Sequence, residues 1–135
     1  MNDLKLPTIE YRAWDTKDNR MIDWSELLDY RSGFVEYLRN PQELIFLPFV
    51  GKFDSTNNKI YAYDIVTAGD NFPSLIEWDN ESGKWVLHEV YPRRGKYADK
   101  YDRYHELNAY TNGLGTIIGN YFQTPSLLGK FRRVI

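Results

Sequence analysis

Two short runs of alternating apolar and polar residues, separated by a turn-forming segment, constrain the fold of this chain most strongly. The runs cover residues 74–78 and 84–88, and the segment 79–83 between them ends in glycine. Alternation with a period of two places Ile76 and Trp78 on one face of a strand. A five-residue loop containing glycine is a common hairpin connection. The pattern therefore predicts an antiparallel hairpin.

Other segments also carry strand signals, and aromatic residues make up 16% of the chain, which favours sheet. Pro48 lies inside one apolar run and places its later part at an edge or bulge, because proline lacks an N–H donor. Asp64 marks a turn or bulge within another run. The further predicted strands are residues 9–14 with a return strand beginning at Met21-Ile22, residues 44–50, residues 59–67 and residues 116–122.

Helices are predicted at only a few places. Asp23 and Glu26 have the spacing of a capping box before an apolar pair, which predicts a short helix over residues 24–31. Residues 34–38 fit a helix or a strand equally well. The further predicted helical segments are residues 98–109, from tyrosines at helical spacing, and residues 124–128, with proline at the first helical position.

These segments predict a mainly β fold, made of small barrel-like subdomains with SH3-like hairpins and one or two short helices. We expect a single domain over residues 1–135, because a chain of this length normally forms one core. The chain has no cysteine, so neither a thiolate metal site nor a redox thiol is expected. It also lacks a signal peptide and a membrane-length apolar run, which predicts a cytoplasmic protein without a membrane partner.

Charge is distributed unevenly along the chain. Residues 1–92 hold 9 basic and 16 acidic side chains, a net charge of −7, whereas residues 93–135 hold 8 basic and 3 acidic, a net charge of +5. The two parts attract each other, or the second part faces an acidic partner.

A basic segment rich in tyrosine is the main candidate binding site that the residues themselves indicate. Cations beside aromatic rings are typical of single-stranded nucleic-acid binding, since charges meet phosphates and rings stack on bases. The alternative is that this segment packs on the acidic part of the chain. The candidate residues are Arg93, Arg94, Lys96, Tyr97, Lys100, Tyr101, Arg103 and Tyr104, and a second basic group is Lys130, Arg132 and Arg133.

No arrangement of residues identifies a catalytic centre. His88 and His105 lie 17 positions apart without a recognised metal-ligand spacing. Carboxylates cluster at residues 15–23 and 54–70, where Asx-turns explain them better than acid–base chemistry does. We therefore expect no cofactor, metal or catalytic residue, and a small carboxylate- or metal-dependent hydrolase is the least favoured function.

Three segments, in order, resemble the YopX-type family of phage and prophage proteins. They are Tyr11-Arg12-Ala13-Trp14-Asp15 followed by Met21, Gly51 and Asp54 followed by Lys59-Ile60-Tyr61 and Asp64-Ile65-Val66, and Ile118-Gly119-Asn120-Tyr121-Phe122 with Pro125 and Leu127-Leu128. The chain departs from the family pattern at Val50, Lys52, Asn58 and Ala62-Tyr63. The resemblance implies a β-rich protein of a bacterial cytoplasm, and it implies no established activity, cofactor or catalytic residue.

The motif positions serve as markers of the fold rather than of a reaction. They are Arg12, Trp14, Asp15, Gly51, Asp54, Ile60, Tyr61, Asp64, Ile65, Val66, Gly119 and Asn120. We expect Arg12 to pair with Asp64 or with Asp15. Such a pair would hold the structure together, and the alternative is a small recognition site at the same place.

The favoured function is non-enzymatic binding of a protein partner by a phage-type accessory protein. Aromatic side chains, which are abundant here, are enriched at protein interfaces. The candidate contact surfaces are residues 24–38 and the C-terminal tail, and a homo-oligomer is one form that the binding could take. The alternative is nucleic-acid binding through residues 91–104 and the basic C-terminus.

Overall fold

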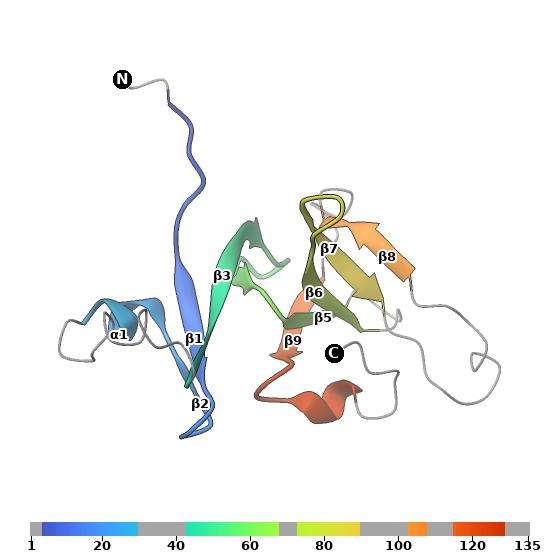
Figure 1. Ribbon diagram of the computed structural model, residues 1–135. Helices are drawn as coiled ribbons and strands as arrows, with labels where there is room; N and C mark the ends of the chain where they lie inside the picture. The colour runs from blue at the N-terminus through green and yellow to red at the C-terminus, as the bar shows by residue number, and fades with distance from the viewer. Residues whose placement is uncertain (1–3, 30–42, 68–72, 90–102, 108–114, 129–135) are drawn as a thin grey trace.

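A computed structural model describes residues 4–29, 43–67, 73–89, 103–107 and 115–128. The described elements are mainly strands, as predicted, with one short α-helix and one 3-10 helix. They form a four-stranded sheet of order β2-β1-β3-β4 and a five-stranded sheet of order β8-β7-β6-β5-β9, which lie side by side in Figure 1. No helix in these ranges is long and apolar enough to cross a membrane.

The first sheet begins with the predicted N-terminal hairpin. Strand β1 (Tyr11–Asp15) pairs antiparallel with β2 (Arg20–Ile22) and with β3 (Leu44–Phe53). Helix α1 (Trp24–Leu28) follows β2, and the Asp23 side chain accepts a hydrogen bond from the Glu26 N–H at its N-terminus. The helix ends earlier than the expected range of 24–31, because Asp29 is extended. Residues 34–38 lie outside the described ranges.

Strand β3 changes its partner at Pro48. The ladder with β1 ends at the pair Tyr11 and Pro48, and the ladder with β4 (Lys59–Tyr61) starts at Phe49. The register shifts between Phe49 and Phe53, and Gly51 adopts a left-handed φ of 85° there. The sequence expectation of an edge or bulge after Pro48 is therefore confirmed.

The second sheet contains the predicted hairpin of β6 (Ser74–Asp79) and β7 (Lys84–Glu89). Ile76 lies opposite Leu87 and Trp78 opposite Trp85, so the expected faces are confirmed. Strand β5 (Asp64–Thr67) pairs with β6 and with β9 (Thr116–Asn120), and η4 (Pro125–Leu128) follows as the predicted helical turn.

Two sequence expectations about elements are wrong. The expected strand over residues 59–67 is two strands in different sheets, because Ala62 and Tyr63 form a turn in which Tyr63 has a left-handed φ of 63°. The expected helix over residues 98–109 contains β8 (Arg103–Glu106), which pairs with β7. Pairing with that edge outweighs the helical spacing of the tyrosines.

Each sheet has its own core, and β3 contributes to both. Leu44 packs with Ala13, Ile22 and Leu27 in the first core. Val50, later in β3, packs against the second core, which comprises Ile60, Val66, Ile76, Leu87 and Leu107. A third cluster, on the other face of the second sheet, brings Leu128 of η4 against Ile65 and Leu75.

Candidate functional site

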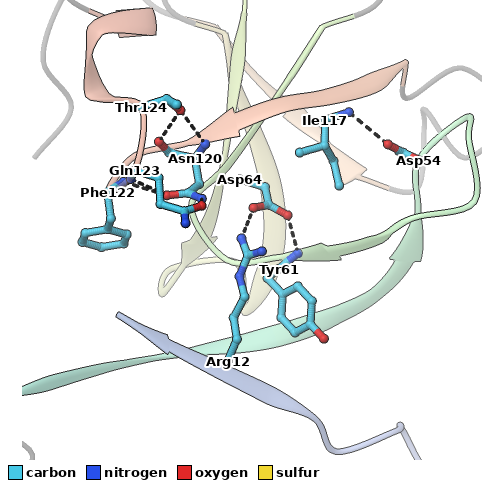
Figure 2. A network of polar contacts seen from close by, with 9 residues as sticks. All are labelled: Arg12, Asp54, Tyr61, Asp64, Ile117, Asn120, Phe122, Gln123 and Thr124. Atoms are coloured by element: carbon cyan, nitrogen blue, oxygen red, sulfur yellow. Dashed lines mark hydrogen bonds and ion pairs between the residues drawn. The ribbon is translucent and has the colours of Figure 1, made fainter. Parts of the chain in front are cut away.

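A buried ion pair joins the two sheets. Arg12 on β1 donates a hydrogen bond through Nη2 to Oδ1 of Asp64 on β5 (Figure 2). The backbone N–H of Tyr61 donates to the other carboxylate oxygen at 2.8 Å. The side chain of Asp64 is 1% exposed and that of Arg12 is 20% exposed. Of the two pairings expected for Arg12, the structure contains the one with Asp64.

Burial dominates the electrostatics of Asp64. It raises the pKa of the carboxyl from 3.8 to about 6, although the Arg12 charge and the Tyr61 N–H favour ionisation. The nearby negative charge of Asp54 also acts to raise the pKa. The Arg12 guanidinium also lacks one hydrogen bond, because its buried Nε has no partner within the described part of the chain. The contact therefore holds two desolvated groups that water would solvate better.

The Tyr61 side chain extends this contact along the end of β1. Its ring lies 4.6 Å from the guanidinium carbon of Arg12, in a cation–π arrangement. The Tyr61 hydroxyl donates to Glu10, and Lys59 Nζ lies 2.8 Å from the same carboxylate. The hydrogen bonds from Lys59 and Tyr61 lower the pKa of Glu10, whereas burial and the Glu10 contact raise the pKa of Tyr61. We call Arg12, Asp64, Tyr61, Glu10 and Lys59 the junction.

An aromatic stack lies beside the junction. The indole of Trp14 on β1 stacks on Phe122 with ring centres 5.9 Å apart and planes at 24°. Phe122 also contacts Tyr63 edge-on at 5.8 Å, and Tyr63 contacts Tyr121 at 6.0 Å. The contributions of Tyr63 and Phe122 were missed from the sequence, because they depend on the turns that follow β4 and β9.

Asp54 closes the loop between β3 and β4 and ties it to β9. Its Oδ1 accepts from the backbone N–H groups of Thr56 and Asn58, and its Oδ2 accepts from the Ile117 N–H at 3.0 Å (Figure 2). Burial opposes ionisation of this carboxyl, but these donors outweigh burial and lower its pKa to about 2. Both oxygens therefore have backbone partners.

Asn120 organises the turn between β9 and η4 in a similar way. Its Oδ1 accepts from the N–H groups of Phe122 and Gln123, at 2.9 and 2.8 Å, and Thr124 Oγ1 bonds back to the Asn120 backbone (Figure 2). Gly119 precedes it, and a Cβ placed there would lie 2.1 Å from Thr124 Oγ1. Only glycine allows η4 to approach β9 this closely.

The other motif residues lie in turns and cores. Asp15 accepts hydrogen bonds from the backbone N–H groups of Lys17 and Asp18 and so closes the first hairpin turn. Ile60, Ile65 and Val66 are buried. The structure thus brings Arg12, Tyr61 and Asp64 together at one place and distributes the remaining motif positions over the fold.

The basic, tyrosine-rich segment falls mostly outside the described residues. Arg103 and Tyr104 belong to β8, where their backbones pair with Glu89 and His88. The rest of the candidate group lies outside the described ranges, as do Lys130, Arg132 and Arg133; its members are Arg93, Arg94, Lys96, Tyr97, Lys100 and Tyr101. The nucleic-acid hypothesis stays a prediction from the sequence.

Within the described ranges, no group of three or more His, Asp or Glu side chains could hold a metal ion. His88 is buried, and its Nδ1 lies 2.7 Å from Glu77 Oε2. A pocket beside this pair is lined by Glu77, Trp78, Asp79, Glu81 and Val86. Apart from the alternation of the hairpin, no sequence pattern indicated that pocket.

The fold and the junction define a class of strand-rich protein in which one strand of the first sheet contributes to both cores and a buried Arg–Asp pair joins the two sheets. The family model described as YopX protein matches residues 10–129, so the chain belongs to the YopX family. The crystal structure of protein EF1440 from Enterococcus faecalis is similar, with a TM-score of 0.50 and 17% identity over 91% of this chain and 99% of that chain. This likeness shows the fold alone. No curated protein matches the chain.

Proposed function

We propose that this protein is a phage- or prophage-type accessory protein of the bacterial cytoplasm that acts by binding a protein partner, without catalysing a reaction. Membership of the YopX family supports the class. The carboxylates of Asp15 and Asp54 accept hydrogen bonds from backbone N–H groups. These bonds support a structural role for the carboxylate clusters that the sequence analysis considered for acid–base chemistry. The partner is a second copy of the chain or another protein.

The observation that carries this proposal is the exposed apolar segment before β1. Residues 4–9 run clear of both sheets in Figure 1. Leu4, Leu6 and Ile9 are 64%, 81% and 73% exposed. Aliphatic side chains concentrated in so short a segment are typical of a protein contact, since water solvates them poorly.

The backbone of this segment fits the same role. Within the described residues, the segment 4–9 has no backbone hydrogen bond, and the ladder of β1 with β3 begins after it, where Phe49 N–H donates to the Glu10 carbonyl at 2.8 Å. An extended segment with free N–H and C=O groups can add to the edge of a partner's sheet. Apolar side chains then supply affinity in addition to the backbone bonds.

A charge placed on this segment tests the proposal. We expect Leu6→Asp to weaken binding of the purified partner at least tenfold, because a buried leucine contributes about 1.5–3 kcal/mol. Thr8→Asp is the matched control, since it adds the same charge to the same exposed segment. Affinity capture first identifies the partner, light scattering detects self-association, and titration then measures both variants.

Equal binding of the Leu6→Asp and Thr8→Asp variants would contradict a role for the apolar segment. Binding of labelled oligonucleotides by the purified protein would favour the alternative, nucleic-acid binding. In that case labelled oligonucleotides would show saturable binding that weakens with salt and is lost when Arg93, Arg94 and Lys96 are neutralised.

A further inference from the structure

The described chain divides into two lobes that share β3. The N-terminal lobe contains β1, β2, α1 and residues 44–48 of β3, and it is built around the core of Ala13, Ile22, Leu27 and Leu44. The C-terminal lobe contains the rest of β3, β4 to β9 and η4. Strand β4 pairs with β3 in the first sheet, but its Ile60 belongs to the C-terminal core, against which Val50 also packs. Figure 1 shows β3 passing from one lobe to the other.

Backbone pairing of β3 is interrupted where the strand crosses from one lobe to the other. Pro48 cannot donate a backbone hydrogen bond, and it lies where the strand leaves β1 and turns to β4. The register is irregular between Phe49 and Phe53, and the left-handed Gly51 has open space around the position of a Cβ. A few residues with interrupted pairing can absorb the change of backbone angle that a hinge requires.

Glu10, which precedes β1, bonds to Lys59 and Tyr61 on β4 beside this hinge, and two side chains of β1 hold the N-terminal lobe against the second sheet. Arg12 bonds to Asp64 on β5 (Figure 2), and Trp14 stacks on Phe122 after β9. Both contacts come from one strand of the N-terminal lobe, two positions apart, and both reach the C-terminal lobe. We call these four residues the latch.

Closing the latch costs free energy, because it buries polar groups of Asp64 and Arg12, and this cost makes opening easier. The closed latch keeps Asp64 almost fully buried and leaves the buried Nε of Arg12 without a described partner. Separation of the lobes would return both groups to water, which offsets much of the lost ion pair. An open arrangement therefore lies within reach as a minor state, which becomes populated when a latch contact is removed.

We propose that the N-terminal lobe is hinged at residues 48–51 of β3 and that the pairs Arg12–Asp64 and Trp14–Phe122 form a latch that closes it on the C-terminal lobe. Opening the latch uncovers the rings of Trp14, Tyr63 and Phe122 between the lobes. This conformational device does not depend on the partner-binding segment at residues 4–9.

Spin labels on the full chain test the hinge directly. Because the chain has no cysteine, Lys17→Cys and Glu81→Cys place one label on an exposed turn of each lobe. We expect a single distance distribution in the parent protein and a second population at longer distance after Arg12→Met. Arg20→Met is the matched control, since Arg20 pairs with Glu26 inside the N-terminal lobe, and it should leave the distribution unchanged.

A second variant keeps the test decisive if Arg12→Met does not fold. Trp14→Phe retains an aromatic ring but reduces the stack on Phe122, and it should also add the longer population. If either latch variant is folded by circular dichroism and keeps the parent distribution, the proposal is wrong. A failure here would leave the Leu6→Asp result unaffected, so the two proposals stand separately.

Discussion

Asp64 shows how one buried residue can make stability depend on pH. Its pKa in the folded protein is about 6, above the reference value of 3.8, so the folded state binds this proton more tightly than the unfolded state. The stabilisation from this group is fully present below pH 3.8 and is lost as pH rises through about 6. We expect the free energy of unfolding of the parent, relative to Asp64→Asn, to fall by roughly 2–3 kcal/mol between about pH 4 and about pH 7.

Urea unfolding of both proteins across this range measures that difference. Asp64→Asn is the natural reference, because it keeps the shape of the side chain and does not titrate, so the lost ion pair with Arg12 leaves the pH dependence of this group out of the reference curve. Titrating groups common to both proteins contribute equally to both curves and cancel. Parallel curves for the two proteins would show that burial does not raise the pKa of Asp64.

The sequence could suggest the Arg12–Asp64 pair but could not select it. Arg12 and Asp64 are 52 positions apart, and Asp15 was an equal candidate partner on the same strand. The choice depends on two features of the fold: Asp15 serves its own turn, and the turn at Ala62 and Tyr63 brings Asp64 within reach of Arg12. The burial of Asp64 follows from packing and has no signature in local sequence.

At the scale of elements, η4 is held against β9 at close range. A Cβ at Gly119 would lie 2.1 Å from Thr124 Oγ1 and 2.7 Å from Leu127 Cδ1. We therefore expect Gly119→Ala to destabilise the protein by about 1–3 kcal/mol, because η4 must shift away from the strand. Thermal unfolding measures the change, and Ser126→Ala, on an exposed position of the same helix, should have little effect. A Gly119→Ala protein as stable as the parent would rule out this close packing.

Elements with local patterns were predictable, and elements that depend on distant partners were not. The hairpin of β6 and β7 follows from alternation and a glycine-containing loop, and η4 begins at the predicted proline. Strand β8 was predicted as a helix, because the edge of β7 that it pairs with is invisible to local spacing. The break between β4 and β5 was misplaced, since a tyrosine rarely adopts the left-handed conformation found at Tyr63.

The same limit applies to the candidate site. Three residues of the junction, Arg12, Tyr61 and Asp64, were recognised as motif positions, but their assembly from β1, β4 and β5 required the topology. The exposed segment at residues 4–9 was missed, because three aliphatic residues near a terminus give no periodic signal. Only the structure shows that the ladder of β3 with β1 ends at Pro48, so that β3 does not pair with residues 4–9.

At the scale of the molecule, a strand common to two cores couples their stability. Leu44 belongs to one core and Val50 packs against the other, so neither core can lose β3 without affecting its neighbour. We propose that residues 1–135 form one domain and expect a single cooperative unfolding transition. Tryptophan fluorescence and far-ultraviolet circular dichroism should give the same midpoint. Two separated transitions would show that the lobes unfold independently.

The pairing of β5 with β9 has a consequence for synthesis on the ribosome. The first sheet is complete once Tyr61 has left the exit tunnel, whereas β5 waits for Thr116–Asn120 to emerge before its second edge is covered. Until then a nascent chain presents an unpaired strand edge, and Asp54 lacks the Ile117 N–H that it later binds. A chain truncated before Thr116 would thus be prone to aggregation, and crowded polysomes would be the place where neighbouring copies mispair.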